Sequence, residues 1–376
     1  MTKILHCADL HLEASFAGQD LPPTVARQRR ADLRQALARI IGLAREHRVD
    51  AVAIAGDLYE QDLASTETGA FLAQQFATLD PIPVFIAPGE HDRMGPESLY
   101  AVIEWPANVH IFQPGPLASA SVGPDVQLWG AAYPSEPVHT TLSSLPGGRH
   151  TTHLLLLHAA WGSEDGEMLQ RLDGASLQHC GFSAALLGHE HCGRSWQEGR
   201  VQCVYPGSAE PLAWAEAGGE HVAALVTAEN GTCHVEKIPV NRWRYLELRA
   251  DLSGCISTEE AAAVLSGELR RLPGPVDECT IVRLILSGMR RFELDRRLLG
   301  TRISTPAHLQ YELEPTQTYD LAMLAREPSV RGLLVRRFQE RLEAPQSATE
   351  KRAMLAALNL ALRALEGRKV GPDADR

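Results

Sequence analysis

The chain has 376 residues, of which 44% are hydrophobic and 22% are charged, and its formal net charge is -11. This composition excludes a disordered protein, and no uninterrupted apolar run, including the four leucines at residues 154–157, approaches the length that spans a bilayer. Because the seven cysteines lack the close spacing of a disulfide scaffold and the first residues lack a secretory signal, we expect a soluble cytoplasmic protein with no membrane segment.

The first 240 residues alternate short apolar runs with helical stretches. Residues 3–8 form an apolar run typical of a buried strand, and residues 27–47 repeat apolar side chains at helical spacing. A second helix is predicted at residues 66–79. Further strands are predicted at residues 50–55, 83–87, 109–112, 126–131, 153–157, 184–187 and 201–205, and a hairpin at residues 221–240. This alternation predicts an α/β layered domain with strands packed between helices.

The pattern changes near residue 242. A small α+β domain is predicted from strands at residues 245–248, 280–286 and 308–314 and a helix at residues 258–271. Two amphipathic helices follow Pro328, and the second opens with Ser347 and Glu350 in capping-box spacing. The predicted divisions are a first domain at residues 1–241, an α+β domain at 242–327, a helical segment at 328–370 and a disordered tail at 371–376.

Five short polar segments each follow a predicted strand. They are Asp9-Leu10-His11, Gly56-Asp57, Gly89-Glu90-His91-Asp92, His158 and Gly188-His189-Glu190-His191. Because the loops after the carboxyl ends of parallel strands converge on one crevice, we expect these side chains to share a pocket. Any one fragment is more often a surface polar group or a satisfied core histidine. Five of them in this order are hard to obtain by chance.

The residue types in these segments indicate a metal centre. Mixed carboxylate and imidazole ligands suit Mn²⁺, Fe or Zn²⁺ rather than a soft-metal thiolate site. More than four candidate ligands exceed what one tetrahedral ion needs, which favours two ions that share a bridging carboxylate. Two such ions can hold phosphate oxygens and stabilise the charge of an in-line displacement, so the pattern indicates phosphoester hydrolysis.

The five segments resemble the motifs of the calcineurin-like metallophosphoesterases, which read D-x-H, GD, GNH(D/E), H and GHxH. The resemblance covers roughly residues 1–240. Within that family, three segments are similar to the SbcD-type DNA-repair exonuclease branch, with its YhaO-like bacterial members nearest: residues 7–12, 55–59 and 205–208. The resemblance implies a layered metallophosphoesterase sandwich, a small α+β DNA-capping domain, C-terminal helices that dock on an SMC-like ATPase, and a homodimer.

Carried over by position, the resemblance also implies roles for single residues. Asp9, His11 and His191 would hold one metal ion. His158 and His189 would hold the second, with Glu90 as a further ligand. Asp57 would bridge both ions, which would be Mn²⁺, with Fe or Zn²⁺ as alternatives. His91 would be the catalytic histidine and Asp92 would orient its ring.

Glu90 departs from the family pattern, which usually has asparagine at this position. Glutamate also binds hard ions through oxygen, but it is longer and charged. With Asp9, Asp57 and Glu90 ionised, two divalent ions leave a net charge of +1 instead of +2, so the metals should bind more tightly and polarise phosphate less. The site could be active with an altered metal preference, weakened, or metal-binding without much catalysis; because His91 and the other ligands are intact, we favour an active but altered site.

The charge along the chain is uneven. Residues 290–376 hold 16 Lys and Arg against 12 Asp and Glu, whereas residues 1–289 hold 20 against 35. No basic surface explains nucleic-acid binding by itself. The favoured function is nevertheless a metal-dependent DNA exonuclease subunit of a double-strand-break repair complex. The alternatives are a phosphoesterase for small molecules and a DNA-end-binding or scaffolding subunit with weakened catalysis.

Overall fold

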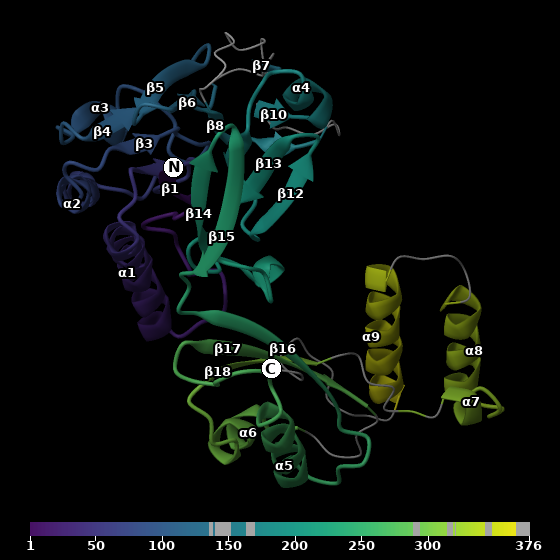
Figure 1. Cartoon of the computed structure of the whole chain (residues 1–376). Coiled ribbons are helices and arrows are strands. Elements are labelled where there is room, and N and C mark those ends of the chain that lie inside the picture. The colour runs from purple at the N-terminus through teal and green to yellow at the C-terminus, as the bar shows by residue number, and fades with distance from the viewer. Residues whose placement is uncertain are drawn as a thin grey trace. The chain divides into compact units, whose positions relative to one another are not determined.

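The structure is a computed structural model that describes the chain except for residues 135–137, 140–151, 163–169, 289–293, 314–318, 320, 343–347 and 366–376. The chain divides into two compact units, Met1–Arg244 and Tyr245–Arg376 (Figure 1). The predicted tail at residues 371–376 and the predicted cap residue Ser347 lie outside the described residues, and the predicted domain boundaries stay predictions. No helix in the described part of the chain is long and apolar enough to cross a membrane.

Two six-stranded sheets form the first unit. The first has the order β15 (Thr232–Pro239), β14 (Val222–Glu229), β1 (Thr2–Cys7), β2 (Ala51–Ile54), β3 (Val84–Ile86) and β4 (Val109–Ile111). The second has the order β12 (Arg194–Glu198), β13 (Val201–Tyr205), β11 (Ala184–Gly188), β8 (Thr152–His158), β6 (Val126–Gly130) and β5 (Ala118–Val122). In each sheet four neighbouring strands run parallel, β1 to β4 and β13 to β6. The carboxyl ends of these strands therefore lie at one edge of each sheet.

The two sheets pack face to face, and helices cover their outer faces. Ile4 of β1 lies in a cluster between the sheets with Leu154 of β8, whereas the next residue, Leu5, faces the opposite side and packs with Leu37. Leu37 belongs to α1 (Pro23–Glu46), which covers the first sheet together with α2 (Thr66–Ala77) and the short α3 (Leu99–Val102). On the outer face of the second sheet, Leu177 of α4 (Gly174–Gln178) packs on the strands. Each fully buried Leu stabilises this sandwich by about 1.5–3 kcal/mol.

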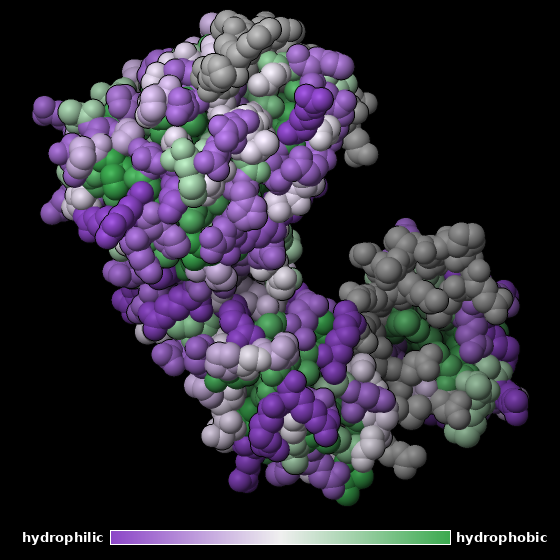
Figure 2. Space-filling model, in the orientation of Figure 1, coloured by the Kyte–Doolittle hydropathy of each residue, from purple (hydrophilic) through white to green (hydrophobic). Residues whose placement is uncertain are grey.

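A smaller sheet and a 3₁₀ turn complete the first unit. The sheet has the order β7 (Val138–His139), β10 (Gln170–Leu172) and β9 (Ala160–Trp161), and the turn is η1 (Trp214–Glu216). Figure 2 shows that hydrophilic residues cover most of the visible face of this unit and that apolar residues reach it only in small patches.

The second unit contains a three-stranded sheet and two sets of helices. The sheet is β16 (Arg244–Asp251), β17 (Thr280–Ser287) and β18 (His308–Leu313), and α5 (Thr258–Leu269) and α6 (Arg296–Arg302) pack on it in one apolar cluster. The helices α7 (Leu321–Leu324), α8 (Val330–Leu342) and α9 (Ala348–Leu365) share a separate cluster around Val335, Leu358 and Leu362. The last residue of the predicted strand 308–314 lies outside the described residues.

The predicted fold class is confirmed: a layered α/β sandwich, a small α+β sheet with helices, and C-terminal helices. The predicted strands and long helices of the first 240 residues are present, with ends that shift by a few residues. The largest shift is in α1, which begins at Pro23 instead of residue 27 because a proline suits the first turn of a helix. The strands β5, β7, β9, β10 and β12 were not predicted.

Candidate metal centre

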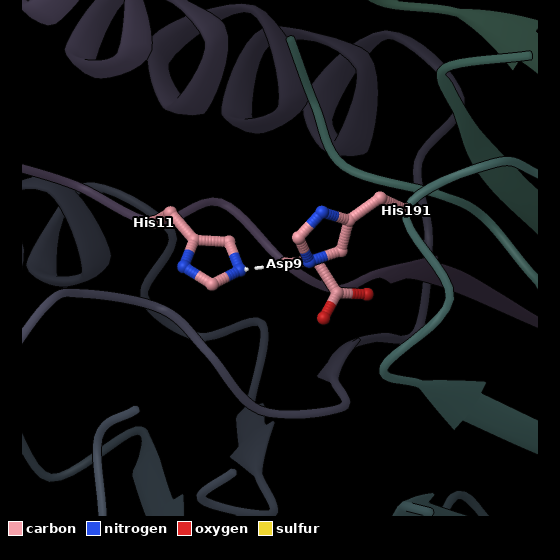
Figure 3. A group of neighbouring side chains, drawn as sticks. All are labelled: Asp9, His11 and His191. Carbon is pink, nitrogen blue, oxygen red and sulfur yellow. Dashed lines mark hydrogen bonds between the residues drawn. The ribbon is translucent and has the colours of Figure 1, made fainter. Parts of the chain in front are cut away.

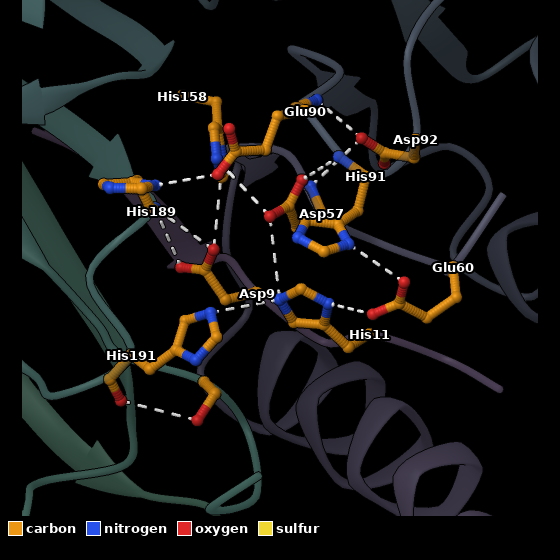
Figure 4. A network of polar contacts seen from close by, with 12 residues as sticks. Asp9, His11, Asp57, Glu60, Glu90, His91, Asp92, His158, His189 and His191 are labelled. Carbon is orange, nitrogen blue, oxygen red and sulfur yellow. Dashed lines mark hydrogen bonds and ion pairs between the residues drawn. The ribbon is translucent and has the colours of Figure 1, made fainter. Parts of the chain in front are cut away.

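The five polar segments follow parallel strands of both sheets and meet at one edge of the sandwich (Figure 4). Three come after β1, β2 and β3 of the first sheet, and two lie at the ends of β8 and β11 of the second sheet. The structure brings all seven predicted metal ligands together. Four groups have potential ligand atoms within 4.8 Å of one another: Asp9, His11 and His191; Glu90, His158 and His189; Asp9, Asp57 and His158; and His11, Asp57 and His91.

The backbone at these residues is strained. Asp9, His11 and Asp57 have φ angles of 52°, 45° and 50°, and His189 has φ 114°, although non-glycine residues rarely adopt positive φ. Such conformations cost on the order of 1–3 kcal/mol each and cluster at functional sites. Gly89 allows the loops to close, because a Cβ at this position would collide with the carboxylate of Asp57.

The first group consists of Asp9, His11 and His191 (Figure 3). The Nδ1 of His11 lies 2.6 Å from the carboxylate of Glu60, and the Nδ1 of His191 lies 3.0 Å from that of Glu216. A carboxylate acceptor keeps the proton of a neutral imidazole on Nδ1, so both Nε2 atoms carry lone pairs. These two Nε2 atoms lie only 3.1 Å apart, and two lone pairs at this distance are favourable only when they share a cation.

The second group consists of Glu90, His158 and His189. His158 donates from Nδ1 to the carbonyl oxygen of Ala55 at 2.9 Å, and burial lowers the pKa of this histidine. Its Nε2 is buried and has no hydrogen-bond partner among the described residues. The His189 Nδ1 lies 3.2 Å from Glu90, and this contact lowers the pKa of Glu90 to about 2. The group therefore offers a carboxylate and a buried lone pair, which fit a divalent cation.

Asp57 lies between the two groups. Its Oδ2 is 3.6 Å from the Nε2 of His11 and 3.4 Å from the Nε2 of His158. Asp9 is fully buried, and burial together with repulsion from Asp57 raises its pKa. A divalent cation would offset this repulsion and favour the ionised form of both carboxylates. The residues present thus fit two divalent ions with Asp57 in the bridging position.

His91 lies beside this centre with a half-exposed ring. Its Nδ1 is 2.9 Å from Glu60, whose other oxygen contacts His11, and the hydrogen bond with Glu60 raises the pKa of His91 to about 9. Burial alone would raise the pKa of Glu60, but its hydrogen bonds with the two histidines lower it. One carboxylate therefore holds both a candidate metal ligand and the candidate catalytic histidine.

The prediction that Asp92 orients the ring of His91 is wrong. Asp92 is fully buried and accepts hydrogen bonds from the backbone nitrogens of Asp57, Leu58 and Gly89 and from the hydroxyl of Tyr100. Burial and repulsion from Asp57 raise the pKa of Asp92 to about 7. Its side chain fixes the loops that carry the ligands instead of contacting His91.

Two carboxylates of the site were not predicted from the sequence. Glu60 had a usable signal, because it directly follows the predicted segment at residues 55–59 and stands three residues after Asp57. Glu216 had none: it comes from η1, and no motif marks this turn. It holds His191 and also accepts hydrogen bonds from the Ser208 hydroxyl and the Leu212 backbone nitrogen, each at 2.9 Å.

The family model described as calcineurin-like phosphoesterase matches residues 2–193, just over half of the chain and all five polar segments. The chain belongs to this family. The similarity of this calcineurin-like phosphoesterase to two curated relatives agrees with the predicted SbcD-type branch. An uncharacterised metallophosphoesterase YhaO of Bacillus subtilis is 29% identical over 245 residues, which cover 62% of this chain and 59% of the relative. A DNA double-strand break repair protein Mre11 of Aeropyrum pernix is 26% identical over 273 residues, 67% of this chain and 64% of the relative.

The matches span less than two thirds of the length of either curated relative. Among solved structures, a protein of Thermus thermophilus is similar over 63% of this chain and 98% of its own, at 16% identity and a TM-score of 0.38. The family membership supports a metal-binding phosphoesterase domain of the hydrolase class at residues 2–193, and the activity of the whole protein, its substrate and its metal are proposals.

Proposed function

We propose that this chain is a two-metal phosphodiesterase that acts on DNA ends as the nuclease subunit of a double-strand-break repair complex. The observation that carries the proposal is Asp57, which lies within 3.6 Å of histidine nitrogens in both ligand groups. The name of the Mre11 relative supports DNA as the substrate. The mixed oxygen and nitrogen donors support Mn²⁺, with Fe or Zn²⁺ as alternatives.

Each part of the centre has a role in this proposal. Asp9, His11 and His191 would hold one ion, Glu90, His158 and His189 would hold the other, and Asp57, which lies between the two groups, would be shared by both ions. Two bound divalent ions would polarise the scissile phosphate and lower the pKa of a water molecule. His91, held by Glu60 and half-exposed, is placed to donate a proton or a hydrogen bond to the reacting phosphodiester.

Digestion of end-labelled linear DNA with Mn²⁺ tests this function. We expect the wild-type chain to degrade the DNA and His91→Ala to lose about 10²-fold or more in rate, the range for a general acid. His179→Ala is the matched control, because His179 is an exposed histidine at the end of α4, and should keep full activity. A metal-loaded wild-type chain that does not degrade DNA would contradict the proposal, and hydrolysis of a chromogenic phosphodiester alone would favour a small-molecule phosphoesterase.

Glu90 favours one second candidate, a DNA-end-binding or scaffolding subunit with weakened catalysis. Its carboxylate contacts His189 and adds a negative charge that would reduce the polarising power of the ions. Glu90→Asn separates the two functions in the same digestion assay. Nuclease activity in wild type supports the enzyme, whereas activity that appears only in Glu90→Asn supports the scaffolding subunit.

Partners complete the proposal: an SMC-like ATPase that binds the helical segment at residues 328–370, and a second copy of the chain. Val330 and Leu333 of α8 support the docking role, because their side chains are 68% and 52% exposed. Replacing both by glutamate should abolish ATPase binding in a pull-down with the purified ATPase and leave phosphodiester hydrolysis unchanged. A monomeric mass in light scattering would contradict the homodimer.

A further inference from the structure

Arg93 lies next to the metal centre in a fixed position. It follows Asp92 in the loop after β3, and its Nε donates to the backbone oxygen of Glu90 at 3.1 Å. Its guanidinium carbon lies 5.3 Å from the ring centroid of Tyr133, and the Tyr133 ring stands edge-on to His158 at 5.8 Å. The ring of Tyr133 therefore contacts both the guanidinium of Arg93 and His158 of the second ligand group.

The outer part of this guanidinium is not used by the fold. Within the part of the chain that the structure describes, Nη1 and Nη2 of Arg93 have no hydrogen-bond or ion-pair partner, and the residue is exposed. Arg194, the first residue of β12 and three residues after His191, is different. It pairs with Glu190 at 2.6 Å and stacks over Trp196. The structure thus positions Arg93 firmly and leaves its donors available.

Arg93 also lines an open pocket that contains part of the metal centre. The pocket has a volume of about 310 Å³, near the lower end for ligand sites, and is lined by Glu60, Gln61, Asp62, Glu90, His91 and Arg93. Of these six residues Arg93 alone carries a permanent positive charge. The carboxylates of Glu60 and Glu90 already contact histidines, and Asp62 is exposed to solvent. An anion that extends from the metal centre into the pocket would therefore contact the Nη1 and Nη2 groups of Arg93.

We propose that Arg93 binds a second phosphate of the substrate, adjacent to the phosphodiester held at the metal centre. The planar guanidinium presents two parallel N–H donors, which match phosphate oxygens bidentately. The site then prefers esters that carry a neighbouring phosphate, such as an oligonucleotide, over isolated phosphodiesters. This inference rests on the proposed function in one respect: the metal centre must bind a phosphodiester.

Calorimetric binding of thymidine dinucleotides to the Mn²⁺-loaded chain tests the subsite. The dinucleotides are phosphorothioate-linked to slow hydrolysis, and carry no terminal phosphate, a 5′ phosphate or a 3′ phosphate. We expect one of the two phosphorylated forms to bind about tenfold more tightly than the unphosphorylated form, the gain of one charge-assisted bidentate contact. Equal affinity of the wild-type chain for all three would overturn the proposal.

Two variants assign the preference to Arg93. In Arg93→Gln the preference should fall to about twofold or less, while the affinity for the unphosphorylated dinucleotide stays as in wild type; general damage to the site would lower all three affinities together. Arg194→Gln is the matched control and should keep the preference. The same preference in Arg93→Gln as in wild type would overturn the assignment. If the wild-type chain prefers a phosphorylated dinucleotide but digests no DNA, the nuclease function is contradicted and the phosphate subsite is still supported. If it digests DNA but shows no such preference, only the subsite is contradicted.

Discussion

Glu216 and Glu60 each hold the Nδ1 of a histidine whose Nε2 faces the metal centre. We predict that Glu216→Gln lowers the affinity for Mn²⁺ about tenfold or more, because carboxylates that orient metal-bound histidines contribute this much in other sites. Isothermal titration of the metal-free chain measures the effect. The matched control is Glu190→Gln, since Glu190 stands between His189 and His191 but pairs with Arg194. Equal affinities in the two variants would contradict the role of Glu216.

The candidate ligands could be predicted from the sequence because each lies at or just after the carboxyl end of a strand, and strand ends fix where a side chain lies. The hydrogen-bond partners of the neighbouring carboxylates could not be predicted in this way. Asp92 follows His91 directly in the chain, yet the bent loop leaves the ring of His91 half-exposed and turns the side chain of Asp92 into the interior, where it is fully buried. Glu216 reaches His191 across 25 residues of chain, and only the folded loop brings them together.

At the scale of the elements, His6 connects the two sheets of the sandwich. Its ring nitrogens lie 3.2 Å from the carbonyl oxygen of Ala53 in β2 and 3.1 Å from that of Leu187 in β11. The side chain is fully buried, and burial lowers its pKa to about 4. The folded chain therefore keeps His6 neutral at a pH where the unfolded chain takes up a proton.

This difference predicts a loss of stability in acid. Above the ordinary histidine pKa of about 6.5, His6 is neutral in both states and has no effect on the pH dependence. As the pH falls from about 6.5 to about 4, only the unfolded chain is protonated, so the free energy of unfolding should fall by up to about 3 kcal/mol. Urea denaturation of the metal-free chain at several pH values measures this slope. His6→Gln should show a shallower slope, and identical slopes would refute the prediction.

The elements that the sequence predicted are those with a clear apolar pattern. The strand β8 is buried along its whole length, and its apolar run is visible in the sequence. The strand β12 is mostly exposed and polar, and it exists because it pairs with β13 at the edge of the sheet. Pairing between β1 and β14 joins residues more than 200 positions apart, which no local pattern encodes. The arrangement of two stacked sheets follows from such long-range pairing.

At the scale of the whole molecule, the acidic charge limits how this chain can bind DNA. Two divalent ions add four positive charges to the formal charge of -11, which leaves about -7. Much of the positive charge lies in residues 290–376, outside the metal centre. Contacts with DNA phosphates would have to come from bound metal ions, from a few arginines such as Arg93, or from a partner such as the proposed ATPase.

We therefore predict weak DNA binding by the isolated chain, with a shallow salt dependence. Each phosphate contact contributes about -0.9 to the slope of the logarithm of affinity against the logarithm of salt concentration. For a chain that makes three phosphate contacts or fewer, raising the salt concentration from about 50 to 200 mM would reduce the affinity for DNA at most about fortyfold. Fluorescence anisotropy with a labelled duplex, with Mn²⁺ and with a chelator, measures both quantities. Because the ions supply part of the positive charge, the chelator should weaken binding further, and tight binding by the metal-free chain at physiological salt would require a basic surface that its charge distribution does not provide.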